Sequence, residues 1–123
     1  MKRTILLIDD ESDIVQVVKF RLESLGFAVV TAQSGEEGLA KAKTEKADLI
    51  LLDVILGDTT GFEVCKKIKN EIDPQAKVII YTAKIDGVDA KKARESGADA
   101  FTVKTGDMDP IKEAIDKVIG LEK

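Results

Sequence analysis

Two mainly apolar runs in the chain each end abruptly in acidic residues. Leu49-Ile50-Leu51-Leu52 is followed by Asp53, and Thr4-Ile5-Leu6-Leu7-Ile8 is followed by Asp9-Asp10-Glu11. Continuous apolar runs of this length are typical of strands buried within a parallel sheet. If the two strands are neighbours, their carboxylates meet at one edge of the sheet, and oxygen ligands at that density suit Mg2+, with Mn2+ as an alternative. The sequence therefore predicts a metal site made by Asp9, Asp10 and Asp53.

Two further polar residues follow apolar runs in the same way. Thr82 comes after Val78-Ile79-Ile80-Tyr81, and Lys104 comes after Ala100-Phe101-Thr102-Val103. Taken alone, the threonine hydroxyl would usually serve its own turn and the lysine would lie on the surface. Asp9-Asp10-Glu11 alone is likewise more often a helix cap, whereas for Asp53 alone a turn role and a functional role are about equal. All of them, however, fall at the carboxyl ends of predicted strands, where doubly wound folds place their sites, and this joint placement favours one functional site.

The chemistry that this set of groups supports is phosphorylation of a carboxylate. A metal held by the acids, a hydroxyl from Thr82 and an ammonium from Lys104 would bind a tetrahedral dianion attached to Asp53. In-line attack on phosphorus needs positioning and charge neutralisation more than acid-base catalysis. The absence of histidine from the sequence is therefore no obstacle to this chemistry.

Strand-like and helix-like segments alternate along the whole chain. The ranges 3–8, 27–32, 48–53, 77–82 and 99–103 are predicted as strands. This alternation predicts an α/β fold with a doubly wound, five-stranded parallel sheet between two helical layers. We expect the flavodoxin-like strand order 2-1-3-4-5, whose crevice lies at the ends of the first and third strands.

The helices between these strands carry recognisable boundaries. A first helix ends at Gly26, a second opens with a capping box of Ser34 and Glu37, and a third covers about 62–72 and ends at Asp73-Pro74. A fourth, near 88–96, has few large apolar residues, so we expect the weakest packing there. The fifth is expected to be capped by Asp109, with Pro110 at its first position. The predicted buried residues are Ile14, Val17, Val18, Leu22 and Leu25, then Phe62, Cys65 and Ile68, then Ile111, Ala114, Ile115, Val118 and Ile119.

Composition bounds the class of protein. The 123 residues, 44% hydrophobic and 34% charged, predict one globular domain over 1–123 with no attached output domain. Cys65 is the single cysteine, which excludes an internal disulfide and a cysteine-based zinc site. A net charge of -4 gives no general attraction to nucleic acid. No apolar run is long enough for a membrane span or a signal peptide, so we expect a cytoplasmic protein.

Over its full length the chain resembles the receiver domain of two-component response regulators. The matching residues are Asp9-Asp10, Asp53, Gly61, Thr82-Ala83, Phe101 and Lys104. The resemblance implies a phosphorylation-dependent switch, not an enzyme, that takes its phosphoryl group from a sensor histidine kinase or a phosphotransfer protein. It also implies an unknown downstream protein or an excised output domain as partner, and a phosphorylation-linked homodimer as an option.

The same resemblance assigns roles to the residues. Asp53 is the expected phosphoacceptor; Asp9, Asp10, Asp53 and the backbone carbonyl of Ile55 are the expected Mg2+ ligands. Thr82, Ala83 and Lys104 are expected to bind phosphate, Thr82 and Phe101 to act as the switch, and Lys84 and Ile55 to tune dephosphorylation. The output face would be the fourth helix, the fifth strand and the fifth helix. A core role for Phe101 remains the equal alternative.

The chain departs from the family pattern at three positions: two residues replace prolines, and Lys84 puts a cation near the expected path of a water that attacks the phosphoryl group. Gly57 replaces the proline that often stands four residues after the acceptor, so we expect a more mobile loop. Thr105 replaces the proline that usually follows the lysine through a cis bond, and we expect a trans bond there.

Three other functions compete with the switch. A flavodoxin-like cofactor protein would need a phosphate-binding loop where this chain has Asp9-Asp10-Glu11, whose charges repel phosphate. A haloacid dehalogenase-type phosphohydrolase needs a second aspartate at the position of Ile55. The most serious rival is a receiver-like docking or dimerisation module that works without phosphorylation, which the changes at Gly57 and Thr105 keep open.

Overall fold

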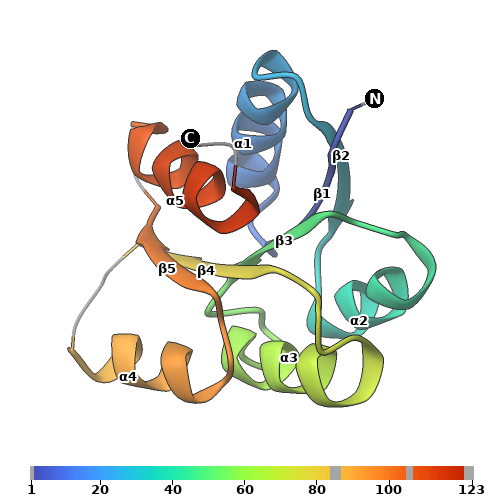
Figure 1. Ribbon diagram of the computed structural model, residues 1–123, viewed down its shortest axis with the longest axis vertical. Helices are drawn as coiled ribbons and strands as arrows, with labels where there is room; N and C mark the ends of the chain where they lie inside the picture. The colour runs from blue at the N-terminus through green and yellow to red at the C-terminus, as the bar shows by residue number, and fades with distance from the viewer. Residues whose placement is uncertain (1, 84–86, 105–106, 121–123) are drawn as a thin grey trace.

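Strands and helices alternate through the residues that the computed structural model describes, which are 2–83, 87–104 and 107–120 (Figure 1). The strands are β1 (Thr4–Ile8), β2 (Ala28–Ala32), β3 (Leu49–Asp53), β4 (Val78–Thr82) and β5 (Ala100–Val103). The helices are α1 (Ser12–Ser24), α2 (Gly35–Thr44), α3 (Gly61–Lys67), α4 (Gly87–Glu95) and α5 (Asp109–Ile119), and a π-helical segment, Ile68–Ile72, extends α3. In the described part of the chain no helix is long and apolar enough to cross a membrane.

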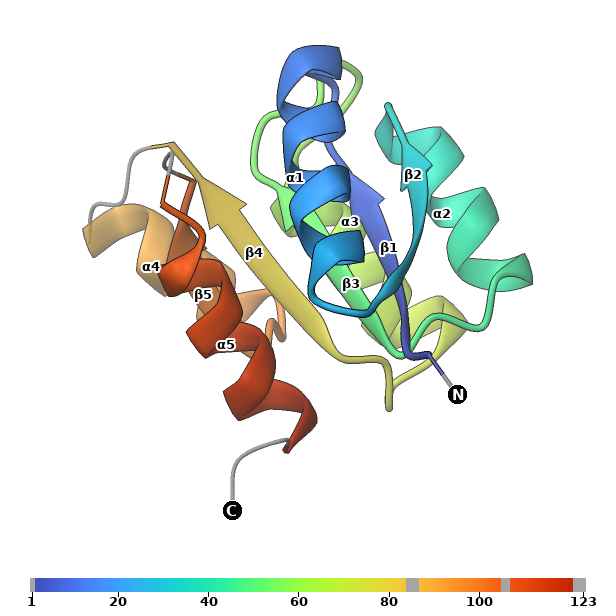
Figure 2. The same ribbon diagram turned by 90° about the horizontal axis from the view of Figure 1, so that it is seen from above.

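The sheet is parallel and has the order β2-β1-β3-β4-β5, which confirms the predicted topology. Helices α1 and α5 cover one face, and α2, α3 and α4 cover the other (Figures 1 and 2). The central position of β1 and β3 brings their carboxyl ends together, because Ile8 pairs with Leu52. The residue that follows β1 and the last residue of β3 therefore lie at the same edge of the sheet.

The core lies on both faces of the sheet, because successive side chains of a strand point to opposite sides. In β1, Leu6 and Ile8 pack toward α2 and α3, whereas Ile5 and Leu7 pack toward α1 and α5. All five residues of β3 and of β4 are buried. Each fully buried Leu or Ile stabilises the fold by about 1.5 to 3 kcal/mol, so the strands that carry the acids contribute much of the stability of the fold.

The buried stripe of α1 differs from the prediction. Val15, Val18 and Leu22 are buried, whereas Val17 is 53% and Leu25 is 43% exposed. The predicted burial of Val17 and Leu25 is therefore wrong. Residues spaced by three and four share one face of a helix, and the face centred on Val18 includes Val15 but not Val17.

The start of α2 contains the predicted capping box in a slightly different form. The Ser34 side chain accepts a hydrogen bond from the Glu37 backbone N–H at 3.0 Å. The Glu37 carboxylate accepts from the backbone N–H of Gln33 at 2.8 Å, and not from that of Ser34 as predicted. The donor to Glu37 is thus one residue earlier in the chain than predicted, and both hydrogen bonds still close the first turn of the helix.

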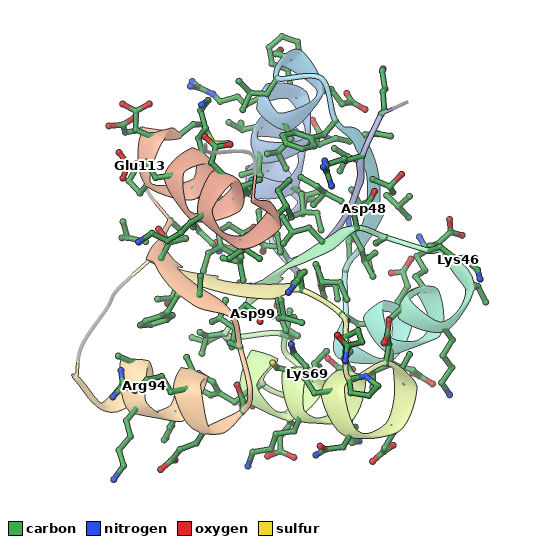
Figure 3. All side chains as sticks on the ribbon, in the orientation of Figure 1. Lys46, Asp48, Lys69, Arg94, Asp99 and Glu113 are labelled. Carbon is green, nitrogen blue, oxygen red and sulfur yellow. The ribbon has the colours of Figure 1, made fainter. Side chains whose placement is uncertain are left out.

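The third helix has the predicted extent but ends in a wider turn. The backbone N–H of Asp73 donates to the carbonyl of Ile68 at 2.7 Å, a five-residue spacing that is characteristic of π-helix. Cys65 and Ile68 are buried as predicted, whereas Phe62 is only half-buried. Lys69 is half-buried in this segment and donates to Asp99 at 2.8 Å (Figure 3).

The start of α5 lies one residue earlier than predicted. Met108 occupies the capping position without a side-chain hydrogen bond, and Asp109 is already in the first turn. The prediction that Asp109 caps the helix, with Pro110 at the first position, is therefore wrong. The Asp107 carboxylate accepts from the backbone N–H of Asp109 at 2.9 Å instead, so an acid still closes this end of the helix. Ile111 and Ile115 are buried, and Ala114, Val118 and Ile119 are half-buried beside them.

Gly61 is required by close backbone packing rather than by an unusual dihedral angle. A Cβ at this position would lie 2.2 Å from the backbone oxygen of Asp53. We expect Gly61→Ala to lower the free energy of unfolding by about 3 kcal/mol, because the backbone that holds Asp53 must move. Gly120→Ala is the control: it has φ = 70° and open space around it, so it should cost only about 1 kcal/mol. Equal losses in urea unfolding would contradict this account of Gly61.

Candidate functional site

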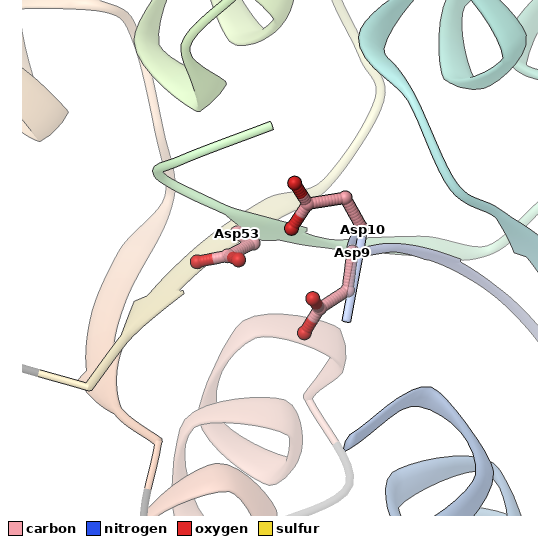
Figure 4. A group of neighbouring side chains, drawn as sticks. All are labelled: Asp9, Asp10 and Asp53. Carbon is pink, nitrogen blue, oxygen red and sulfur yellow. The ribbon is translucent and has the colours of Figure 1, made fainter. Parts of the chain in front are cut away.

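Three aspartates gather where β1 and β3 end. Asp53 is the last residue of β3, and Asp9 and Asp10 directly follow β1. One carboxylate oxygen from each lies within 4.8 Å of the others. Figure 4 shows that the carboxylates of Asp9 and Asp10 point to opposite sides of the chain, so the group surrounds a space rather than forming a row. The structure thus brings together the acids that the two apolar runs predicted.

The three acids differ in their exposure to water. Asp9 is fully buried, Asp53 is buried and Asp10 is exposed. Burial raises the pKa of Asp53 to about 6; the negative charge of Asp9 adds to this shift, and Lys104 opposes it. At neutral pH the Asp53 carboxylate is therefore ionised, although burial and the charge of Asp9 disfavour this ionised form.

Lys104 supplies the positive charge of the site. Its Nζ lies 3.1 Å from Asp9 Oδ2, 3.1 Å from Asp53 Oδ2 and 2.9 Å from Glu11 Oε1. Burial disfavours the charged form, but the bonds to these carboxylates raise the pKa of the Lys104 ammonium above its ordinary value. The backbone holds this residue in place, since its N–H donates to the carbonyl of Thr82 at 2.6 Å.

Thr82 and Ala83 lie at the same edge of the sheet. Thr82 is the buried last residue of β4, and it pairs with Val103, the residue before Lys104. Ala83 is exposed and lines, together with Glu11 and Lys104, a pocket of about 320 Å³ between α1 and the segment before α5. The structure thus places both residues beside the acids, as the strand ends predicted.

Phe101 lies on β5, half-buried against the apolar layer on the α2, α3 and α4 side of the sheet. This intermediate burial is compatible with the core role and with the switch role. The side chain of Ile55 is 71% exposed, and its backbone forms a bridge with Thr60. The carbonyl of Ile55 remains a predicted metal ligand. Lys84 and Thr105, with the expected trans bond, lie outside the described residues.

The loop after Asp53 is tied to α2. Asp58 accepts from the backbone N–H groups of Gly35 at 2.9 Å and Glu36 at 3.1 Å, which anchors the loop on the first turn of that helix. Gly57 has φ = 77°, a value that proline, with φ near -65°, cannot adopt. The loop therefore follows a path that a proline at this position would forbid, and its greater mobility remains a prediction.

Tyr81 is the site residue that sequence reasoning missed. It is fully buried on β4, its hydroxyl donates to Asp9 Oδ2, and the Lys104 ammonium lies 5.0 Å from its ring centroid. Burial and the nearby carboxylates, Asp9 first among them, raise the pKa of this hydroxyl above its usual value, so it remains a donor. The sequence did offer one indication of this role: the only tyrosine of the chain directly follows three aliphatic residues of a predicted strand.

The donor set fits a hard divalent cation. Carboxylate oxygens are the ligands that Mg2+ prefers, and it is commonly held by one or two carboxylates with water and phosphate completing its shell. Asp9, Asp10 and Asp53 supply such oxygens close together, and the exposure of Asp10 leaves one side of the group open to water. The residues present therefore suit Mg2+.

The raised pKa of Asp53 makes a prediction about stability. In the absence of metal, ionising Asp53 costs stability that grows as the pH rises from about 4 to about 6 and is constant above that. We expect Asp53→Asn to raise the free energy of unfolding at pH 7 by about 2 kcal/mol and to have little effect at pH 4. Urea unfolding in a chelator at both pH values measures this. Glu95→Gln, at an exposed position of α4, is the control, and a loss of stability in Asp53→Asn at pH 7 would contradict the prediction.

Comparison with known proteins identifies the family. The family model of the response regulator receiver domain matches residues 5–116 of the chain. The alkaline phosphatase synthesis transcriptional regulatory protein PhoP of Bacillus subtilis is 42% identical over 85% of this chain and 43% of its own length. The transcriptional regulatory protein GlrR of Escherichia coli is 36% identical over 94% of this chain and 26% of its own length. The chain thus spans less than half of the length of these regulators.

Solved structures agree with this result. A CheY-like response regulator receiver domain protein from Methanospirillum hungatei superimposes with a TM-score of 0.90 at 30% identity, covering 98% of this chain and 96% of the other. The chemotaxis protein CheY4 of Vibrio cholerae gives a TM-score of 0.89 at 27% identity, covering 96% of this chain and 99% of the other. With the parallel sheet order, the acidic cluster and the matched family model, the chain belongs to the receiver domains of two-component response regulators.

Proposed function

We propose that the protein is a signalling switch that accepts a phosphoryl group on Asp53 from a histidine of a sensor kinase or phosphotransfer protein. The observation that carries this proposal is the position of the Asp53 carboxylate. It lies 3.1 Å from the Lys104 ammonium and within a cluster of acids suited to Mg2+. An ionised nucleophile, a nearby cation and a metal site in one place are what phosphoryl transfer requires.

The transfer itself needs little covalent chemistry from the protein. An oxygen of ionised Asp53 attacks phosphorus as the bond to the donor histidine nitrogen breaks, and that nitrogen keeps the electron pair. Mg2+, held by Asp9, Asp10, Asp53 and the carbonyl of Ile55, would supply positive charge to the phosphoryl oxygens. The Lys104 ammonium supplies a second positive charge, on the side of Asp9. Because its Nζ lies 3.1 Å from Asp53 Oδ2, it also orients the attacking carboxylate.

The phosphorylated state would redistribute the contacts of Lys104 and Thr82. Phosphorylation adds close to two negative charges and three acceptor oxygens beside Lys104, which is already shared by three carboxylates. We infer that Lys104 and the Thr82 hydroxyl turn to the phosphoryl group, with Ala83 contributing its backbone, and that Phe101 then moves inward. The output face would be α4, β5 and α5, and a coupling of about 1 to 3 kcal/mol would change partner affinity 5- to 150-fold.

An exposed apolar surface supports docking of a phosphodonor protein beside Asp53. Phe20 and Val17 of α1 are 69% and 53% exposed, and they line a groove of about 660 Å³ against Met108. This groove shares Val17 and Met108 with the pocket that reaches Lys104. Exposed apolar patches of this kind mark protein interfaces, so a helix of the donor could lie here while its histidine reaches Asp53.

The wider setting of the switch follows from the family. The relatives named above are longer transcriptional regulators, so the response passes either to an output domain joined to this one or to a separate partner, with a phosphorylation-linked homodimer as one form. We propose a cytoplasmic location and no enzymatic activity beyond assistance of its own phosphorylation and dephosphorylation.

A docking module that works without phosphorylation is the second candidate. The observation that favours it is Gly57, whose φ of 77° gives the loop after Asp53 a path that proline cannot take. Such a loop would alter the surroundings of the Ile55 carbonyl and so the metal site. The experiment below separates the two functions.

Intact mass after incubation with a small acyl phosphate tests the switch. We expect a gain of one phosphoryl group that requires Mg2+ and is lost in Asp53→Asn, because both the nucleophile and its charge balance are needed. Asp48→Asn is the matched control: this exposed acid stands just before β3, at the opposite end of the strand from Asp53. No mass gain at saturating donor and metal would favour the docking module.

The lifetime of the phosphorylated protein tests the role of Lys84. A cation two residues after Thr82 would lie near the path of an attacking water, so we expect the half-life of the Lys84→Ala phosphoprotein to differ by at least about twofold. Decay of the phosphorylated mass with time measures it, with Lys91→Ala, at an exposed position of α4, as the control. Equal half-lives in the wild type and Lys84→Ala would exclude the role.

A further inference from the structure

Tyr81 reaches the acidic site from the core. Its ring belongs to the apolar layer beneath α1 and α5, where it packs with residues such as Leu7 and Ile111. Its hydroxyl lies at the boundary of that layer and donates to Asp9 Oδ2. Because the ring is fully buried and close-packed, the hydroxyl has a fixed position at the side of the acids that faces α1 and α5.

Asp9 is held at both of its carboxylate oxygens. Oδ1 accepts from the backbone N–H of Glu11 at 2.9 Å, and Oδ2 accepts from the Tyr81 hydroxyl and lies 3.1 Å from Lys104 Nζ. Of these partners, Lys104 has a flexible side chain and is shared with two other carboxylates. The Glu11 amide and the Tyr81 hydroxyl are the rigid ones, and they hold the carboxylate from its two ends.

We propose that Tyr81 is a positioning residue for the metal site: its hydroxyl fixes the orientation of Asp9 so that this carboxylate is presented to a divalent cation shared with Asp10 and Asp53. This inference rests on the metal site of the proposed function. The donor must be the tyrosine, since an ionised carboxylate can only accept. Partners that orient a ligand in this way commonly contribute a 10- to 100-fold increase in metal affinity.

The alternative is that the bond only satisfies a buried hydroxyl. In that case Tyr81→Phe would lower stability but leave the metal affinity of the folded protein unchanged. If Tyr81 positions Asp9, the loss of the hydroxyl leaves the fully buried carboxylate with one rigid partner, and metal affinity falls. Phe keeps the ring and its contact with Lys104, so the substitution isolates the hydroxyl.

Direct Mn2+ binding to the unphosphorylated protein, followed by the paramagnetic resonance of the free ion, tests the proposal. We expect Tyr81→Phe to weaken Mn2+ binding about tenfold. Ser96→Ala is the matched control: it removes another buried hydroxyl, which donates to Ala93 at 2.6 Å beneath α4, and should leave binding unchanged. Affinity of Tyr81→Phe within twofold of the wild type would overturn the role of Tyr81 alone. Absence of Mn2+ binding by the wild type would overturn the metal site and, with it, both proposals.

A second measurement has its decisive readout in the wild type and so does not depend on the folding of Tyr81→Phe. Tyr81 is the only tyrosine and the chain has no tryptophan, so tyrosine emission reports on this single hydroxyl. We expect emission to change as Mn2+, or Mg2+ measured in parallel, fills the site, with a midpoint equal to that of direct binding, and to stay constant in Asp10→Asn. Constant emission in the wild type through saturation would overturn the link between Tyr81 and the metal.

Discussion

Mutual repulsion among carboxylates is the constraint on which the rest of this structure depends. Three aspartate oxygens lie within 4.8 Å of one another at an edge where Asp9 and Asp53 are buried, so their charges are poorly screened by water. The buried strands β1 and β3 hold them there, and burial of the apolar residues of those strands outweighs the repulsion. A site assembled in this way is destabilised unless positive charge is brought to it.

Lys104 provides that charge in the described structure. It reaches Asp9, Asp53 and Glu11 at 2.9 to 3.1 Å, so one ammonium is shared among three acids. A group shared in this way can exchange one carboxylate for a stronger acceptor at small cost, because it still keeps others. A phosphoryl group on Asp53 would be such an acceptor. Under the proposed function, the same charge balance that stabilises the resting protein would also make it responsive to phosphorylation.

Surrounding contacts connect the site to the rest of the molecule. Asp58 ties the loop after Asp53 to α2, the backbone of Lys104 is bonded to that of Thr82, and Tyr81 joins Asp9 to the layer under α1 and α5. The site is therefore connected to both faces of the sheet. Phe101 is half-buried on the α4 side of the sheet, whereas the exposed Phe20 and Val17 lie on the opposite face.

The sequence by itself determined the sheet, its strand order and the edge at which Asp9, Asp10, Asp53, Thr82 and Lys104 meet. It could do so because strand ends in a parallel sheet are set by local apolar patterning and chain order. The tertiary structure alone decided which face of α1 is buried, that Asp109 does not cap α5, that Asp58 anchors α2, and that Tyr81 bonds to Asp9. Some of these features depend on contacts between residues as far apart as 72 positions. Others depend on a shift of one residue in the start of a helix or in its buried face. Local sequence patterns determine neither.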